Sequence, residues 1–291
     1  MSNLHDSYAK ILSLLHELEE HDSYQLQRRA PALSDKELIA LCLASECLGI
    51  DSERYLFKRL PSELGAKIER SVYNKRRRKL GVKMEWFRQR IAEKLAPSEP
   101  YHLVDSMPLE VCKLSRARRS RVCSEHSESS PDYGYCAAQK THYFGYKIHA
   151  VCTQQGVFKT FDISKASVHD IHYLEDVKQH LSQCVLIGDK GYLSRHYQDD
   201  LFESCGVQVR TPMRKNQLNY KEFPVAFRKA RKRIETLFSQ LCDQFMIRRN
   251  YAKTFTGFAI RVLSKITALT VIQWINQRNG HNINNLKIIV V

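Results

Sequence analysis

The segment 185–192, Val-Leu-Ile-Gly-Asp-Lys-Gly-Tyr, decides between the fold classes open to this chain. Val185 to Ile187 is a short continuous apolar run, as expected of a central strand buried on both faces of a sheet. Asp189 follows between two glycines, which let backbone or ligand approach closely. A charge at the carboxyl end of a buried strand suits a cleft residue. Taken alone, Gly-Asp-Lys-Gly is more often a surface turn, so the wider pattern has to decide.

Strand and helix patterns continue on both sides of this segment. Tyr101 to Asp105 predicts a strand that stops at Ser106-Met107-Pro108, and two further strands form a hairpin joined at Gln154-Gln155-Gly156. Strands paired by a hairpin and then alternating with helices predict a mixed α/β sheet flanked by helices. The remaining predicted elements are the hairpin strands 143–152 and 157–163, helices near 170–181 and 194–204, a strand near 207–210, and long helices at 224–245 and 255–277.

The first 95 residues carry helical patterns almost throughout. Ser34 and Glu37 form a capping box ahead of an apolar run. A basic run follows, made of Lys75, Arg76, Arg77, Arg78 and Lys79. Short helices ending in such a run fit a helix-turn-helix module that binds DNA, and a plain helical bundle with a solvated charged face fits equally well. With a linker at 96–100, we predict a helical DNA-binding domain at 1–98 and a catalytic domain at 99–291.

Charge favours a polyanionic partner. The 291 residues carry a net charge of +15, and residues 101–291 alone hold 28 Lys and Arg against 16 Asp and Glu. Such a surplus promotes association with polyanions, although a solubility feature or an RNA binder would show it too. The nine cysteines have no zinc-finger spacing, so free thiols are expected. The N-terminus lacks a signal-peptide pattern, and the apolar stretch 255–275 contains Arg261 and Lys265, which predicts a core helix and not a membrane span.

Glu235 stands out on the helix predicted at 224–245. Residues 210–233 hold nine Lys and Arg and the single acid Glu222. At 100° per residue, Glu235 borders the apolar face, with Arg231 one turn earlier. An ordinary ion pair between these two would contribute about 0.3–0.5 kcal/mol. One acid at the border of a basic helix, downstream of two acids predicted at strand ends, favours a functional role instead. The apolar face consists of Phe227, Ala230, Ile234, Leu237, Phe238, Leu241 and Phe245.

Three segments together carry a resemblance to a known family. Residues 104–106 (Val-Asp-Ser), 188–192 (Gly-Asp-Lys-Gly-Tyr) and 231–238 (Arg-Lys-Arg-Ile-Glu-Thr-Leu-Phe) resemble the three acidic motifs of bacterial insertion-sequence DDE transposases. Their acids are separated by 83 and then 45 residues, which is also similar to that family. Residues 143–149 (Tyr-Phe-Gly-Tyr-Lys-Ile-His) resemble its second strand, and 167–170 (Ser-Val-His-Asp) resemble the turn into the following helix.

The resemblance implies a ribonuclease H-like fold, shared with retroviral integrases, and a transposase. Asp105, Asp189 and Glu235 would be the catalytic residues and the ligands of two Mg²⁺ ions, with Mn²⁺ as the alternative ion. Water would first free a 3′-hydroxyl at the element's end, and that hydroxyl would then attack target DNA. The implied partners are the terminal inverted repeats, the target DNA and a second copy of the chain on DNA. The implied location is the bacterial cytoplasm, in association with the nucleoid, with no membrane partner.

The basic residues around the acids match the family in part. Relatives carry Tyr, Arg, Glu and Lys at fixed spacing around the third acid. Here Arg231 and Glu235 match, whereas Arg228 stands at the Tyr position and Cys242 at the Lys position. Lys190 or Arg249 would then supply the missing lysine's contact with DNA. The full set expected to contact DNA is Lys75, Arg76, Arg77, Arg78, Lys147, Lys190, Arg228, Arg231 and Arg249.

Other functions are weaker matches. His169-x-x-His172 has a metal-ligand spacing but no third soft ligand nearby, which disfavours a zinc hydrolase. The Arg/His cluster of a tyrosine recombinase is absent from the sequence. The aromatics in 143–147 could stack RNA bases, but aromatics in core strands are commoner. Two alternatives stay open beside an active transposase: a catalytically silent or repurposed DNA-binding protein, and a host nuclease of the same fold.

Overall fold

The computed structural model describes residues 4–19, 30–217 and 220–286. Their backbone divides into two compact units. The first, called the helical unit here, joins the residues up to 95 with 240–252 and 256–286. The second, the sheet unit, contains 96–239 with 253–255. The first cut therefore falls at the predicted linker, whereas the C-terminal helix groups with the N-terminal helices. The functional division at residue 98 stays a prediction.

The helical unit contains six N-terminal helices in its described residues. Its capping box is confirmed: Glu37 N donates to Ser34 Oγ (3.1 Å), and Ser34 N donates to the Glu37 carboxylate (2.6 Å). Every regular element described in this segment is helical, as the sequence predicts. The helices are α1 (Leu4–Leu18), α2 (Asp35–Cys47), α3 (Glu53–Arg59), α4 (Ser62–Gly65), α5 (Arg70–Lys79) and α6 (Gly81–Leu95).

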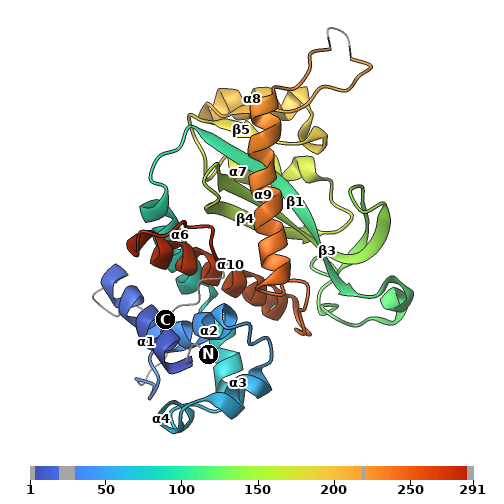
Figure 1. The fold of residues 1–291 in the computed structure, drawn as a ribbon. Coiled ribbons are helices and arrows are strands. Elements are labelled where there is room, and N and C mark those ends of the chain that lie inside the picture. Colours follow the sequence, from blue (N-terminus) through green and yellow to red (C-terminus); the bar gives the residue numbers. More distant parts are fainter. Residues whose placement is uncertain (1–3, 20–29, 218–219, 287–291) are drawn as a thin grey trace. The chain divides into compact units, whose positions relative to one another are not determined.

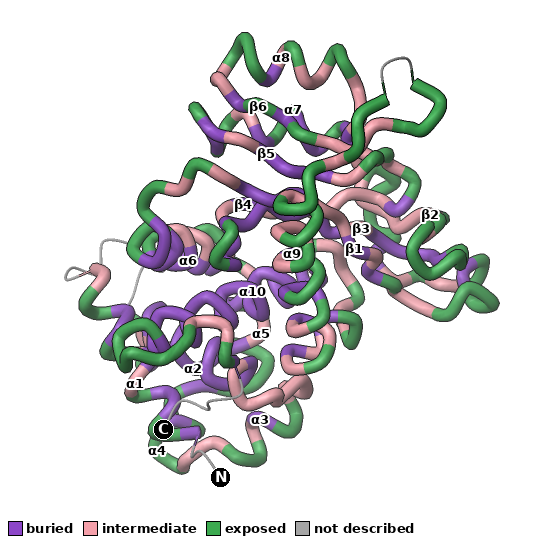
Figure 2. Tube along the Cα trace, turned by 45° about the horizontal axis from the view of Figure 1, so that its top comes forward, coloured by how far each residue is buried: buried purple, intermediate pink, exposed green. Residues whose placement is uncertain are grey.

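Helix α10 (Phe255–Arg278) is the core helix of the helical unit. It is long and apolar enough to cross a membrane by length and composition, but 83% of its apolar window is buried (Figure 2). Several of its polar side chains contact other residues of the unit. Lys265 Nζ donates to Glu46 of α2 at 2.6 Å, and Ser264 Oγ lies 3.4 Å from Cys42 Sγ. Burial and internal pairing confirm the prediction of a core helix over a membrane span.

The sheet unit is built on six strands, in the order β2-β3-β1-β5-β6, with β4 also paired to β3 (Figure 1). Strand β1 is antiparallel to β3 and parallel to β5, and β5 is parallel to β6, so the sheet is mixed, as predicted. This mixed sheet with flanking helices is compatible with the ribonuclease H-like fold. The strands are β1 (Tyr101–Cys112), β2 (Asp132–Cys136), β3 (Thr141–Thr153), β4 (Phe158–Lys165), β5 (Val185–Ile187) and β6 (Gln208–Arg210).

Helices cover both faces of this sheet. Helices α7 (Tyr173–Val177) and α8 (Arg195–Cys205) pack on one face, in a cluster that includes Val104 of β1 and Leu186 of β5. Helix α9 (Val225–Asp243), which starts in the sheet unit, packs on the other, where Phe238 stacks on Phe158 of β4. Because side chains alternate along a strand, the neighbours of Val104 point toward α9. Short 3₁₀ turns complete the unit: η1 (Leu114–Arg119), η2 (Asp170–His172) and η3 (Lys190–Tyr192).

The structure corrects two predicted boundaries. Strand β1 continues through Pro108 to Cys112, so Asp105 lies within the strand and not at its end. Pairing with β5 stops at Leu103, and beyond that point a proline facing the open side of β1 costs no hydrogen bond of the ladder. The helix predicted near 170–181 is shorter, because η2 precedes the five-residue α7. The hairpin and the helices near 194–204, 224–245 and 255–277 are confirmed.

Candidate active site

Asp105 and Asp189 occupy matching positions on neighbouring parallel strands. The register pairs Leu103 of β1 with Ile187 of β5, and each aspartate follows two residues later. Adjacent strands lie about 4.8 Å apart, and residues two apart point to the same face. The aspartates are therefore near each other where the parallel pairing ends. Asp189 Oδ1 accepts from Gly191 N at 2.8 Å, which caps η3 and fixes this carboxylate.

Helix α9 brings Arg231 and Glu235 to the same place. The guanidinium of Arg231 lies 3.5 Å from Asp105 Oδ2, and both side chains are 19% exposed. Among the ion pairs of the described residues, Arg231 is joined to Asp105 and not to Glu235. The ordinary pair one turn apart on the helix is thus replaced by a contact between helix and sheet. Glu235 itself is exposed, at the border of the apolar face that the sequence predicts.

The electrostatics of Asp105 link all three acids. Burial, opposed by a hydrogen bond from Ser106 N and by Arg231, raises the pKa of Asp105 to about 6. Asp189 and Glu235 add to this rise, because nearby negative charges disfavour ionisation. A half-buried carboxyl whose pKa is raised by burial and by two neighbouring acids is characteristic of a functional centre. The sheet unit therefore brings the three predicted residues into one electrostatic cluster.

The cluster fits a divalent cation in its donor chemistry. All three side chains offer carboxylate oxygens, the ligands preferred by hard ions such as Mg²⁺. In residues 4–19, 30–217 and 220–286, no group of three His, Cys, Asp or Glu side chains is close enough to hold a metal ion. The Arg231 guanidinium instead supplies the positive charge beside Asp105. The acids thus have the right donors, and a cation would have to draw them together.

A fourth acid, Asp170, lies at this site and was not predicted to be part of it. Its Oδ1 accepts from Lys147 Nζ at 2.7 Å, and the ring of His149 lies 4.0 Å away. A Cβ atom placed on Gly191 would lie 2.9 Å from Asp189 Oδ1 and 3.5 Å from Asp170 Oδ2, so both carboxylates lie close to that glycine. The sequence motif 167–170 predicted only a turn. The contact between η2 and η3 joins residues that are distant in the sequence, so a local motif could not predict it. Lys147, predicted to contact DNA, is neutralised by this pair.

The structure gives two residues of the basic run a role different from the one predicted. Arg76 is buried and donates to Asp35 at 2.7 Å and to the Leu33 carbonyl at 2.7 Å. Arg77 is buried and pairs with Glu53 at 2.8 Å. Guanidinium groups enclosed by carboxylates inside the helical unit cannot also reach phosphates. Only the exposed members of the run, Lys75 and Lys79, and half-buried Arg78 remain for a partner.

The other basic residues predicted to contact DNA are exposed. Lys190 follows Asp189 directly and belongs to the sheet unit, whereas Arg249 belongs to the helical unit. Arg228 pairs with Glu222 at 2.9 Å on the exposed start of α9. Cys242 is half-buried near the end of α9, and burial raises the pKa of its thiol, so it cannot replace the charge of a lysine. Lys190 thus offers an exposed positive charge next to Asp189 within the sheet unit.

Comparison with protein families identifies the chain. Residues 98–271 match the family described as the transposase DDE domain, which covers more than half of the sequence. No curated protein and no solved structure matches the chain. The chain belongs to the transposase DDE domain family, so the predicted family is confirmed. Members of this family act on DNA as transferases or endonucleases and generally use divalent metal ions.

Proposed function

We propose that this chain is the transposase of an insertion sequence. It hydrolyses the phosphodiester bond at the element's ends and joins the freed 3′-hydroxyl to target DNA. The observation that carries the proposal is that Asp189 and Glu235, distant from Asp105 in the sequence, both lie near enough to raise its pKa, with Asp105 and Asp189 at matching positions on adjacent strands. A purely structural role would not require two further acids beside Asp105 that both raise its pKa.

In this proposal Asp105, Asp189 and Glu235 hold two Mg²⁺ ions, or Mn²⁺ in their place. The bound ions would supply activation of the attacking oxygen and stabilisation of the leaving oxygen. Asp105 would become available to hold a cation once Arg231 leaves its carboxylate for a DNA phosphate. Lys190, one residue beyond Asp189, takes the phosphate contact that relatives assign to the lysine missing at Cys242. Arg228 and Arg249 contact DNA outside the reaction centre.

The helical unit contributes sequence recognition in this proposal. Lys75, Arg78 and Lys79 line the exposed side of α5, whose buried arginines fix the helix in its unit. Recognition of the terminal repeats on both ends of an element requires two copies of the chain on DNA. A bacterial, nucleoid-associated location follows from that substrate. The alternative is a silent DNA-binding descendant, which the lack of a closed metal cluster among the described residues favours.

The test is cleavage of DNA that flanks the chain's own gene, with purified full-length protein and Mg²⁺. We expect Glu235→Gln to abolish nicking while DNA binding persists. Glu222→Gln removes an exposed acid from the same basic segment and should cut like the wild type. Nicking that survives Glu235→Gln would refute the metal-site assignment. Wild-type protein that binds without cutting would support the silent descendant, and cutting without joining would indicate a nuclease.

A further inference from the structure

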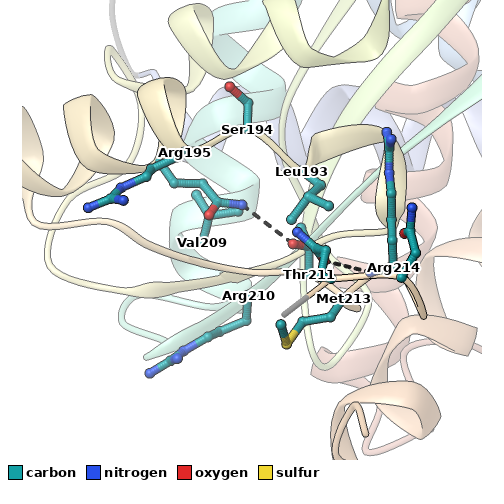
Figure 3. Close-up of a pocket in the computed structure, with 11 residues that line it drawn as sticks. Leu193, Ser194, Arg195, Val209, Arg210, Thr211, Met213 and Arg214 are labelled. Atoms are coloured by element: carbon teal, nitrogen blue, oxygen red, sulfur yellow. Dashed lines mark hydrogen bonds between the residues drawn. The ribbon is translucent and has the colours of Figure 1, made fainter. Parts of the chain in front are cut away.

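A cavity of about 640 Å³ opens in the sheet unit beside Asp189 (Figure 3). Its walls are two segments of chain, 193–198 leading into α8 and 209–217 leading out of β6. The volume is in the range of small-molecule sites, which span roughly 300–1,000 Å³. None of the residues that the sequence analysis expected to contact DNA lines this cavity.

The lining is strongly basic. Three arginines, Arg195, Arg210 and Arg214, contribute to it, and no Asp or Glu does. Arg195 lies 3.4 Å from Asp199 in a fully solvated pair, which is worth little. Arg210 and Arg214 are exposed and form no ion pair with the described residues. In Figure 3 Arg195 and Arg210 extend to the left of the view, and Arg214 lies at the right. The cavity therefore presents uncompensated positive charge.

Apolar side chains give the cavity a surface for a base or a sugar. Leu193, Val209 and Met213 line it together with the amides of Gln198 and Gln217. Apolar contacts with a few polar groups that fix orientation are the usual composition of an organic ligand site. The N-terminal turn of α8, a helix of eleven residues, forms part of the same wall and adds the positive end of the helix dipole. The lining thus suits a ligand that is anionic at one end and apolar at the other.

Hydrogen bonds hold the two walls in a defined geometry. Gln198 Nε2 donates to the Tyr192 carbonyl at 3.3 Å and to Thr211 Oγ1 at 3.4 Å, which joins the walls. Arg214 N donates to Gln217 Oε1 at 2.6 Å and shapes the second wall. The site is therefore formed before any ligand arrives, which lowers the entropy cost of binding.

The strand register locates the cavity next to the carboxylates. Ile187 of β5 pairs with Arg210 of β6, and Gly188 N donates to the Arg210 carbonyl at 3.0 Å. Asp189 and Thr211 consequently leave the same edge of two adjacent strands, which lie about 4.8 Å apart. A DNA strand bound at Asp189 would therefore lie close to this cavity.

We propose that this cavity is a subsite for the DNA strand at the carboxylate site. Arg210 and Arg214 neutralise phosphates adjacent to the scissile one, and Leu193, Val209 and Met213 contact the sugar and base between them. Arg195 is a weaker contributor because of Asp199. The inference rests on the proposed function for its substrate, and it adds two arginines and three apolar residues that contact the strand beside the reaction centre.

The test measures DNA binding by full-length protein against salt, with Ca²⁺ replacing Mg²⁺. The probe is a fluorescent duplex of the DNA that flanks the gene. Each phosphate contact contributes about 0.7–0.9 to the slope of log K against log salt. We expect Arg210→Gln/Arg214→Gln to reduce the magnitude of this slope by that amount per arginine. The matched control, Arg118→Gln/Arg119→Gln, removes the same charge from exposed positions on η1 and should keep the slope.

Two results of the salt titration would overturn the subsite. One is an unchanged slope in the cavity variant, and the other is an equal loss in the control, which would mean that only net charge matters. Competition with inorganic phosphate and with deoxyadenosine monophosphate separates the sources of phosphate. Tight binding of either one, lost in the cavity variant while DNA binding is retained, would assign the cavity to a small anion. If the cavity variant shows the smaller slope but the wild-type chain cuts no DNA, the subsite is supported and the proposed catalysis is refuted.

Discussion

The two groups of basic residues in this molecule behave in opposite ways. The run 75–79 is contiguous and conspicuous in the sequence, yet Arg76 and Arg77 are buried and neutralised by Asp35 and Glu53. Arg210 and Arg214 are inconspicuous, yet they line an open cavity that contains no acid. Local charge density in a sequence therefore does not locate a surface for a polyanion. The pairing of each cation inside the fold decides whether its charge is available.

The largest expected effect is on the stability of the helical unit. Arg76→Gln leaves Asp35 buried without its partner, which costs about 3–5 kcal/mol. Lys75→Gln, on an exposed neighbour, should change the unfolding free energy by less than about 0.5 kcal/mol. Both tryptophans, Trp86 and Trp274, belong to the helical unit, so urea unfolding followed by their fluorescence reports it. Equal stability of the two variants would show that Arg76 is not structural.

A second test concerns His102, a histidine that is buried in strand β1. Neither of its ring nitrogens has a hydrogen-bond partner among the described residues, and burial lowers its pKa to about 4. The pKa of His102 is lower in the folded state than in the unfolded state. The contribution of its neutral ring to the unfolding free energy, this term, is therefore fully present above pH 6.5 and is lost as pH falls toward 4. It amounts to at most about 3 kcal/mol.

His102→Phe removes that term, so the variant should gain stability relative to the wild type as pH falls from 6.5 to 4. The difference between the two proteins is the quantity to measure, because Asp105, with its raised pKa, contributes with the opposite sign in part of this range. Hydrogen exchange of β1 amides in the sheet unit supplies the measurement. A difference independent of pH would mean that His102 does not titrate as described.

A smaller effect concerns the exposed members of the basic run. If the helical unit binds DNA, Lys75→Gln/Lys79→Gln should lower the slope of log K against log salt by at most about 0.9 per lysine. Folding should be unaffected, because both side chains are exposed. Anisotropy of a fluorescent duplex measures the slope. No change would leave the helical unit as a plain structural bundle, the reading that the sequence also allowed.

The smallest effect expected is on the stability of the cavity variant. Arg210→Gln/Arg214→Gln removes two exposed cations without ion-pair partners in the described part of the chain, so unfolding should change by less than about 0.5 kcal/mol. Hydrogen exchange of β5 and β6 amides tests this. A loss comparable to that of Arg76→Gln would reverse the contrast between the two groups and make the cavity arginines structural.

Periodicity predicted the elements better than the contacts between them. The apolar run at 185–187 gave a buried strand, and the stripe on α9 gave the helix that carries Glu235. Pro108 misled the prediction of β1, because only the register shows which edge of a strand lacks a partner. The pairing of Asp35 with Arg76 and the position of Asp170 beside Gly191 also depend on contacts across long separations, which no local pattern encodes.

The most direct test of the central claim is single-turnover cleavage of DNA flanking the gene by Asp105→Asn and Asp189→Asn. Asp162→Asn, on an exposed position of β4, serves as the control. If the acids hold the metal ions, both site variants should lose cleavage and joining while the control retains them, and all three should bind DNA. Cleavage at wild-type rates by either site variant would contradict the assignment of the active site.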